Sequence, residues 1–328
     1  MRSLFFLFLQ VLDKVTLGKM LNDTLFGQSL AIHQLDQSLL SRSETETEAL
    51  NAILLVGWVG TGKSLVAKLI QDSFVAQSNV HKFSVPLHLS DMTNHYILDD
   101  LTEKLEHSCG PSLVILEDVD DGTLQAQKKL EEFVQKLASS PNYKDRRLLI
   151  VATMSTGGPT INKNMLQWIK SSTLRREDVS INHIKDVFDL ANVELQLESA
   201  LVENGFQLTV VPFLPLTREH VTKCLIREML TQGGGLPSSQ DTKLILDEME
   251  YFSESFPVFA AAGCKRISGK VAFLLASKES LIGVAWRYYK NRNSSIITKE
   301  LNNCDVRSRP SNYVKHKCKI TQLYFLTY

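Results

Sequence analysis

Residues 57 to 64 read Gly57-Trp58-Val59-Gly60-Thr61-Gly62-Lys63-Ser64, a complete phosphate-binding loop of the pattern G-x-x-x-x-G-K-[ST]. Its glycines let backbone N–H groups turn inward around an anion, and the helix that follows adds the partial positive charge of its N-terminus. The lysine can reach the β- and γ-phosphates, and the serine hydroxyl can bind Mg²⁺. The stretch therefore predicts that residues from Gly57 to Leu65 bind ATP and Mg²⁺.

The sequence on either side of the loop supports this interpretation. Residues 52–56 are a short apolar run typical of a strand, and residues 65–70 continue as a helix. A phosphate loop requires this order of strand, loop and helix. The alternative is a glycine-rich turn that binds nothing.

Composition places the chain among soluble globular proteins. It has 328 residues, of which 44% are hydrophobic and 22% charged, and its net charge is zero. The whole chain therefore lacks the excess of positive charge expected of a nucleic-acid-binding protein. From Arg266 onward, however, Lys and Arg number 12 against 3 Asp and Glu. This basic tail is either a solvated arm or a segment that binds a membrane surface or an acidic partner.

The N-terminus allows two interpretations. Arg2 precedes a short apolar stretch over residues 4–9, which is too short to span a bilayer. Residues 1–19 are then a signal peptide or hydrophobic anchor, or else they contain a buried first helix.

Alternating strands and helices predict the fold. Strands are expected at 80–89, 112–116 and 147–153 in addition to 52–56, and helices at 25–40, 98–106 and 124–137. This order indicates an α/β fold in which helices cover both faces of a parallel sheet, over residues 20–212. The strand pattern fades after residue 215, and helices at 218–229 and 241–251 indicate a small helical domain over residues 213–270. Residues 271–328 form the basic tail.

A pair of carboxylates follows the apolar strand at 112–116. Glu117 and Asp118 stand where an NTPase needs one carboxylate for the Mg²⁺ shell and one to orient the attacking water. Their usual order is Asp then Glu, and the inversion changes the reach of each by about 1.5 Å. Nucleotide binding is therefore predicted more firmly than fast hydrolysis. The alternative is a solvated acidic turn.

Several segments together resemble the torsin family of AAA+ ATPases, over roughly residues 20 to 270. They are Leu25-Phe26-Gly27-Gln28, the phosphate loop with its tryptophan, Arg175-Arg176-Glu177-Asp178, Pro212-Phe213-Leu214-Pro215-Leu216 with the later His220-Val221 and Cys224, and Gly263-Cys264-Lys265. The phosphate loop alone is generic, whereas the ordered set is specific.

The resemblance implies an ATP-dependent chaperone or remodelling ATPase in the lumen of the endoplasmic reticulum and nuclear envelope. It implies a weak ATPase that acts as a homo- or hetero-oligomer and depends on a membrane-anchored activator, which supplies an arginine to the transition state. By the same resemblance Ser64 and Glu117 bind the metal, Asp118 orients the water, and Lys265 approaches the γ-phosphate.

The resemblance also implies that Cys224 and Cys264 form a redox-sensitive disulfide. None of the five cysteines lies in a C-x-x-C or zinc-binding pattern. Without the resemblance, the residues favour two separate thiols, one of them buried in the helix that starts near Arg218. A bridge requires their Cα atoms to lie within about 7 Å.

Four features depart from the family pattern. Ser64 replaces the usual asparagine, and the acidic pair is inverted. Ser155 or Thr156 stands where the family has its sensor-one asparagine, and the chain continues for 63 residues past Lys265. These departures keep open an alternative in which the protein binds ATP without hydrolysing it and the bound nucleotide fixes a surface for a partner.

Overall fold

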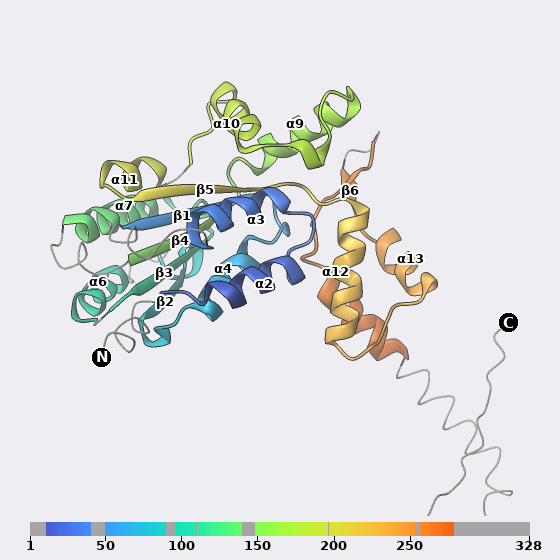
Figure 1. Cartoon of the computed structure of the whole chain (residues 1–328), viewed down its shortest axis with the longest axis horizontal. Helices are drawn as coiled ribbons and strands as arrows, with labels where there is room; N and C mark the ends of the chain where they lie inside the picture. The colour runs from blue at the N-terminus through green and yellow to red at the C-terminus, as the bar shows by residue number, and fades with distance from the viewer. Residues whose placement is uncertain are drawn as a thin grey trace, which may run out of the picture. The chain divides into compact units, whose positions relative to one another are not determined.

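The computed structural model describes residues 11–40, 50–89, 96–108, 110–139, 148–195, 197–252 and 256–278. Five parallel strands form one sheet in the order β2-β3-β4-β1-β5 (Figure 1). The strands are β1 (Asn51–Gly57), β2 (Val80–Ser84), β3 (Ser112–Glu117), β4 (Leu148–Met154) and β5 (Gln207–Phe213). The three central strands are buried along almost their whole length, as expected for a parallel sheet with both faces covered.

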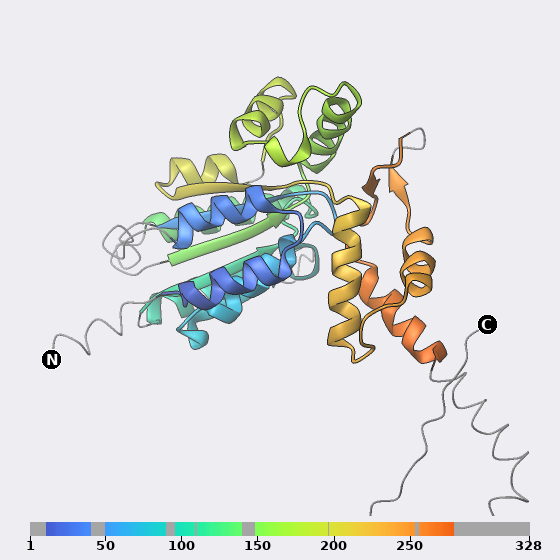
Figure 2. The same ribbon diagram turned by 45° about the vertical axis from the view of Figure 1, so that its right-hand side comes forward.

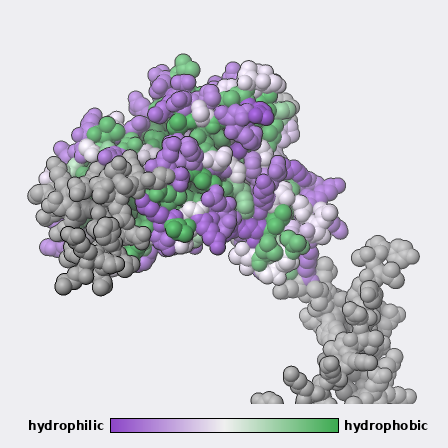
Figure 3. Space-filling view, viewed as in Figure 1, coloured by the Kyte–Doolittle hydropathy of each residue, from purple (hydrophilic) through white to green (hydrophobic). Residues whose placement is uncertain are grey.

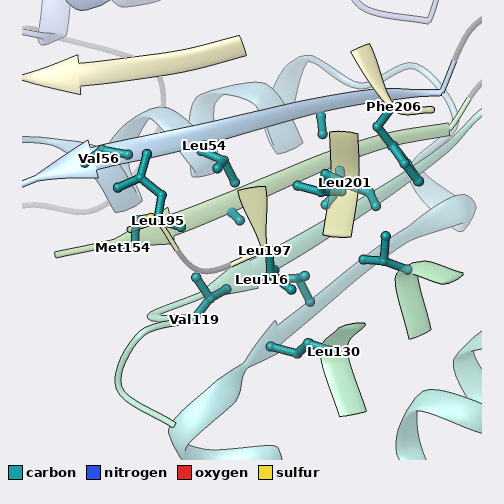
Figure 4. Close-up of a cluster of buried hydrophobic side chains, with 14 of the residues drawn as sticks. Leu54, Val56, Leu116, Val119, Leu130, Met154, Leu195, Leu197, Leu201 and Phe206 are labelled. Carbon is teal, nitrogen blue, oxygen red and sulfur yellow. The ribbon is translucent and has the colours of Figure 1, made fainter. Parts of the chain in front are cut away.

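Helices cover both faces of this sheet, which confirms the predicted α/β fold class. One face packs against α2 (Lys14–Thr24), α3 (Ser29–Leu35) and α4 (Lys63–Ser73). The other packs against α6 (Ile97–His107), α7 (Leu124–Ser139) and α11 (Glu198–Glu203), and α9 (Gly158–Lys170) and α10 (Ile181–Leu190) extend the same core. Alternate strand residues point to opposite faces, so that Leu54 and Val56 enter the core shown in Figure 4, while Ile53 and Leu55 enter the other.

Of the two interpretations of residues 1–19, the described part of that segment fits the buried first helix. Leu12 pairs with Phe74, and Asp13 begins α2 by accepting a hydrogen bond from the Thr16 backbone N–H. Leu17 and Leu21 are fully buried against the sheet. Residues 11–19 therefore belong to the α/β layers, and residues 1–10 of the predicted signal or anchor lie outside the described part of the chain.

Two further elements are shorter than predicted. The strand expected to reach residue 89 ends at Ser84, because Pro86 lies in the first turn of α5 (Val85–His88) and cannot donate a strand hydrogen bond. The helix expected from residue 25 begins only at Ser29, after a left-handed Gly27.

A second core gathers the residues that follow β5. The chain runs from β5 into α12 (Arg218–Thr231), then α13 (Ser239–Asp247), as Figure 2 shows. The hairpin of β6 (Tyr251–Phe252) and β7 (Phe259–Ala260) and a helix from residue 267 complete this helical unit. The pairing of Tyr251 with Ala260 explains why the helix predicted to reach residue 251 ends at Asp247.

Hydrophilic residues are interspersed with small hydrophobic groups on the face drawn in Figure 3. Among the residues that the structure describes, no helix combines the length and the apolar character required to cross a bilayer. The basic tail lies outside the described residues from position 279 onward.

Candidate nucleotide-binding site

The phosphate loop joins β1 to α4, the arrangement that its sequence predicts. Gly62 is the left-handed residue that precedes α4, and Lys63 is the first residue of that helix. Lys63 is only 7% exposed, and its ammonium donates hydrogen bonds to Gly57 O at 2.6 Å and Trp58 O at 2.9 Å. The loop therefore holds a buried cation at a helix N-terminus. Both the lysine charge and the partial positive charge of the helix N-terminus favour a bound anion there.

Burial lowers the pKa of Lys63 to about 8, while the charges of Asp118 and Asp120 act in the opposite direction and that of Lys265 adds to the lowering. A cation without full compensation from its neighbours gains stability from a bound phosphate. The electrostatics of the loop thus suit an anionic ligand.

Sheet order determines which groups face this lysine. Strand β4 lies between β1 and β3, so the ends of β1 and β3 are two strand spacings apart, about 10 Å. Their carboxyl ends lie at the same edge of the sheet because all three strands are parallel. Ligands of parallel α/β sheets bind at this edge.

The two predicted carboxylates at the end of β3 point to different neighbours. Glu117 forms an ion pair with Lys82 on β2, at 3.0 Å. Asp118 has a left-handed φ of 54°, and its backbone N–H donates to Thr153 Oγ1 on β4 at 3.0 Å. Burial raises the pKa of the Asp118 carboxyl, and the nearby charge of Lys63 counteracts this. Asp118, rather than Glu117, is thus turned toward the phosphate loop.

A third carboxylate, which sequence reasoning did not single out, organises the end of β4. Asp120 accepts hydrogen bonds from Ser155 N at 2.7 Å, Thr156 N at 2.6 Å and Thr156 Oγ1 at 2.8 Å. Ser155, which the resemblance places at the sensor-one position of the catalytic site, is therefore fixed through its backbone at the same sheet edge as the loop. The acidic run over residues 117–121 was the only sequence signal, and it could not show which carboxylate would cross to β4.

The predicted Lys265 lies close to the phosphate loop although it comes from the helical unit. Cys264 N donates to Gly60 O at 2.9 Å, and the indole Nε1 of Trp58 donates to Ala261 O at 2.6 Å. Lys265 itself is exposed, and its charge contributes to lowering the pKa of both Lys63 and Asp118. The contact made by Trp58 had no sequence signal beyond an aromatic residue in an otherwise generic loop.

Other segments on which the resemblance rests meet behind the loop. Gln28 is fully buried and donates to Thr61 O at 3.1 Å and Leu214 O at 2.8 Å, and it accepts from Leu214 N at 2.9 Å. The buried Arg176 donates to Pro215 O at 2.9 Å and to Gly27 O. These side chains tie the loop to the connection between the sheet and the helical unit.

Cys224 and Cys264 form a disulfide, with a Cα–Cα distance of 6.2 Å. It links α12 to the segment that contacts Gly60. The bond itself agrees with the prediction, whereas its sensitivity to redox conditions stays a prediction. Cys109, Cys304 and Cys318 lie outside the described residues.

The residues present fit a nucleotide with Mg²⁺. A Cβ at Gly60 would stand 1.9 Å from Ala262 O, so this loop requires glycine where the backbones approach. Ser64 is exposed at the start of α4, and its hydroxyl is an oxygen ligand of the kind that Mg²⁺ prefers. No group of three metal-ligating side chains occurs within the described residues. Mg²⁺ held by phosphates, waters and one or two side chains does not need one.

No protein-family model matches this chain. Among solved structures it is similar to the S. cerevisiae Hsp104–ADP complex, with a TM-score of 0.48 and 15% identity over 85% of this chain and 48% of that chain. It is also similar to the replication initiator DnaA bound to AMPPCP and single-stranded DNA, with a TM-score of 0.44 and 16% identity over 91% of this chain and 76% of that chain.

The chain thus spans about half the length of the Hsp104 chain that it matches.

Proposed function

We propose that this protein is a torsin-like AAA+ ATPase that binds ATP with Mg²⁺ and hydrolyses it. The observation that carries the proposal is the buried Lys63 ammonium in the phosphate loop, with the Asp118 carboxylate acting on it from the end of β3. The loop amides and Lys63 would hold the β- and γ-phosphates, and Ser64 would hold the metal, which supplies charge neutralisation at the phosphates.

The remaining groups then have distinct roles in our proposal. Asp118 orients the attacking water, and its raised pKa favours acceptance of a hydrogen bond or proton from that water. Asp120 holds the Ser155–Thr156 turn in place, and Lys265 approaches the γ-phosphate. Glu117, for which the sequence predicted a metal-binding role, is assigned here to its ion pair with Lys82.

The substitution Asp118→Asn tests this assignment. It keeps the size of the side chain and removes its charge, so we expect ATP binding to persist while turnover falls by about two orders of magnitude or more. The matched control is Asp121→Asn, an exposed carboxylate in the same acidic run. Turnover that survives in the Asp118 variant would show that another group orients the water.

We further propose that the protein works in the lumen of the endoplasmic reticulum and nuclear envelope. The Cys224–Cys264 disulfide supports this, because disulfides persist in oxidising compartments and are rare in the cytosol. Following the family resemblance, a membrane-anchored luminal activator supplies an arginine to the site, and the active form is an oligomer.

A binding module that holds ATP without hydrolysing it is the second candidate. The engagement of Glu117 by Lys82 favours it, because this withdraws one of the two predicted carboxylates from the nucleotide. Steady-state phosphate release, measured with and without the luminal domain of an activator, separates the two candidates. Turnover that rises with the activator supports the ATPase, whereas ATP binding with no turnover in either condition supports the binding module.

A further inference from the structure

Trp58 occupies a position in the phosphate loop where phosphate binding itself requires no aromatic side chain. The loop binds an anion through backbone amides and the lysine. The half-buried indole instead points its only polar atom at another part of the chain and donates from Nε1 to Ala261 O at 2.6 Å. The two residues are 203 positions apart in sequence.

A backbone contact completes the attachment. Cys264 N donates to Gly60 O at 2.9 Å. The two backbones approach so closely that a Cβ at Gly263 would stand 2.3 Å from Gly60 O. The segment over residues 261–264 is therefore held to the loop at one point by a side chain and at another by the main chain.

The backbone of the same tryptophan also contacts the lysine of the phosphate loop. The Trp58 carbonyl accepts hydrogen bonds from Lys63 Nζ at 2.9 Å and from Thr61 Oγ1 at 2.7 Å. The segment bound by its indole ends one residue before Lys265. A Cβ at Gly60 would stand 3.2 Å from Lys265 Cβ, so this lysine starts directly beside the loop.

We propose that Trp58 is a positioning residue that holds the 261–264 segment, and with it Lys265, against the phosphate loop. This inference rests on the proposed nucleotide binding for its functional consequence. The indole transmits the conformation of the loop around Lys63 to the segment that carries Lys265. Loss of the indole donor leaves the loop able to bind phosphate but frees Lys265 from its position.

Hydrogen exchange tests the structural half of the proposal without any nucleotide. Trp58→Phe keeps an aromatic ring and removes the Nε1 donor. A single hydrogen bond contributes about 0.5–1.5 kcal/mol. We therefore expect amides of residues 261–265 to exchange roughly three to ten times faster, while amides of β1 and β4 are unchanged. The control is Trp168→Phe on α9, whose ring lies edge-on to His183. Unchanged exchange at 261–265 would overturn the proposal.

A double-mutant cycle tests the functional half. ATP affinity with Mg²⁺ is measured for Trp58→Phe, Lys265→Ala and the double variant. If Trp58 acts through Lys265, the tryptophan substitution weakens ATP binding severalfold in the presence of Lys265 and has little effect in its absence. Equal effects in both backgrounds would contradict positioning. If Trp58→Phe does not fold, Gly263→Ala replaces it, because its Cβ would separate the same two backbones.

The two tests keep the inference apart from the proposed function. Failure of the unmodified protein to bind ATP refutes the proposed function, and the exchange experiment then still shows whether Trp58 holds the segment. ATP binding together with an additive cycle leaves the proposed function intact and refutes the positioning role.

Discussion

At the scale of single residues, Lys63 determines how the site responds to pH. Its ammonium is buried in the loop, and its pKa is lowered to about 8. A bound polyphosphate favours the charged form, so binding raises this pKa and must be accompanied by proton uptake wherever the free lysine is neutral.

The expected result is an ATP affinity that is nearly constant below about pH 8 and falls above it, by up to about tenfold per pH unit. Calorimetry in buffers of different ionisation enthalpy should show proton uptake near pH 9 and much less near pH 7. Affinity that stays constant up to about pH 9.5 would contradict the pKa assignment.

Gly60 shows the cost of the close approach between the loop and residues 261–264. Gly60→Ala introduces a left-handed alanine and a Cβ that would stand 1.9 Å from Ala262 O. Gly205→Ala is the matched control, because its φ of +81° imposes similar backbone strain with no atom within 4 Å of the new Cβ.

We expect both substitutions to lower the free energy of unfolding by about 1–2 kcal/mol through backbone strain. Gly60→Ala should lose at least about 1 kcal/mol more through overpacking. Urea denaturation measures the difference. An equal decrease in the free energy of unfolding of the two variants would show that the 261–264 segment moves away from the new Cβ without loss of stability.

At the scale of elements, α2 attaches the N-terminal segment to the sheet. Within α2, Leu17 is fully buried on the side that faces the sheet, whereas Val15 is 84% exposed. Leu17→Ala should lower the free energy of unfolding by about 2–5 kcal/mol, because it removes core contacts and leaves a cavity. Val15→Ala, the control, should change it by no more than about 0.5 kcal/mol. A small effect at Leu17 would mean that α2 can detach from the sheet.

Those elements of the α/β fold that carry their own signal were predictable. Strands β3 and β4 and the loop between β1 and α4 can each be identified from their own residues. An uninterrupted apolar run or a glycine-rich turn is recognisable without knowing what it packs against. The extent of β2 was missed, since apolar alternation continues through Pro86 into α5.

The site was predictable only where chemistry fixes spacing. Lys63 and Ser64 follow from the phosphate-binding pattern. The different roles of Glu117, Asp118 and Asp120, however, depend on which neighbouring strand each residue contacts. That choice follows from sheet order, which the sequence did not reveal.

At the scale of the whole molecule, His220 lies where the helical unit joins the sheet domain. Its Nδ1 accepts from Thr217 N at 3.2 Å, and its ring lies against Gly27. Burial, reinforced by the charge of Arg176 and to a lesser extent Lys223, lowers the pKa of His220 to about 4, with Glu219 and Glu177 acting in opposition. The native protein therefore holds this imidazole neutral where the unfolded chain would protonate it.

The sign of the pH effect follows from proton binding. Between about pH 6.5 and pH 4 the unfolded state binds a proton at this position and the native state does not, so stability falls as pH falls through that window. His220→Asn should make the dependence of the urea midpoint on pH shallower there. His33→Asn, at an exposed position, should not. If the urea midpoint depends on pH equally in the unmodified protein, His220→Asn and His33→Asn, then His220 does not cause the loss of stability at low pH.

Our account of the whole molecule depends on nucleotide binding by the phosphate loop, which contacts the helical unit through residues 261–264. Isothermal titration of the folded protein with ATP and Mg²⁺ tests this most directly, with Lys63→Met as the paired variant. Our account predicts saturable binding at one site per chain and its loss in the variant. A folded protein that retains no adenine nucleotide, or a Lys63→Met variant that binds as tightly as the unmodified chain, would contradict it.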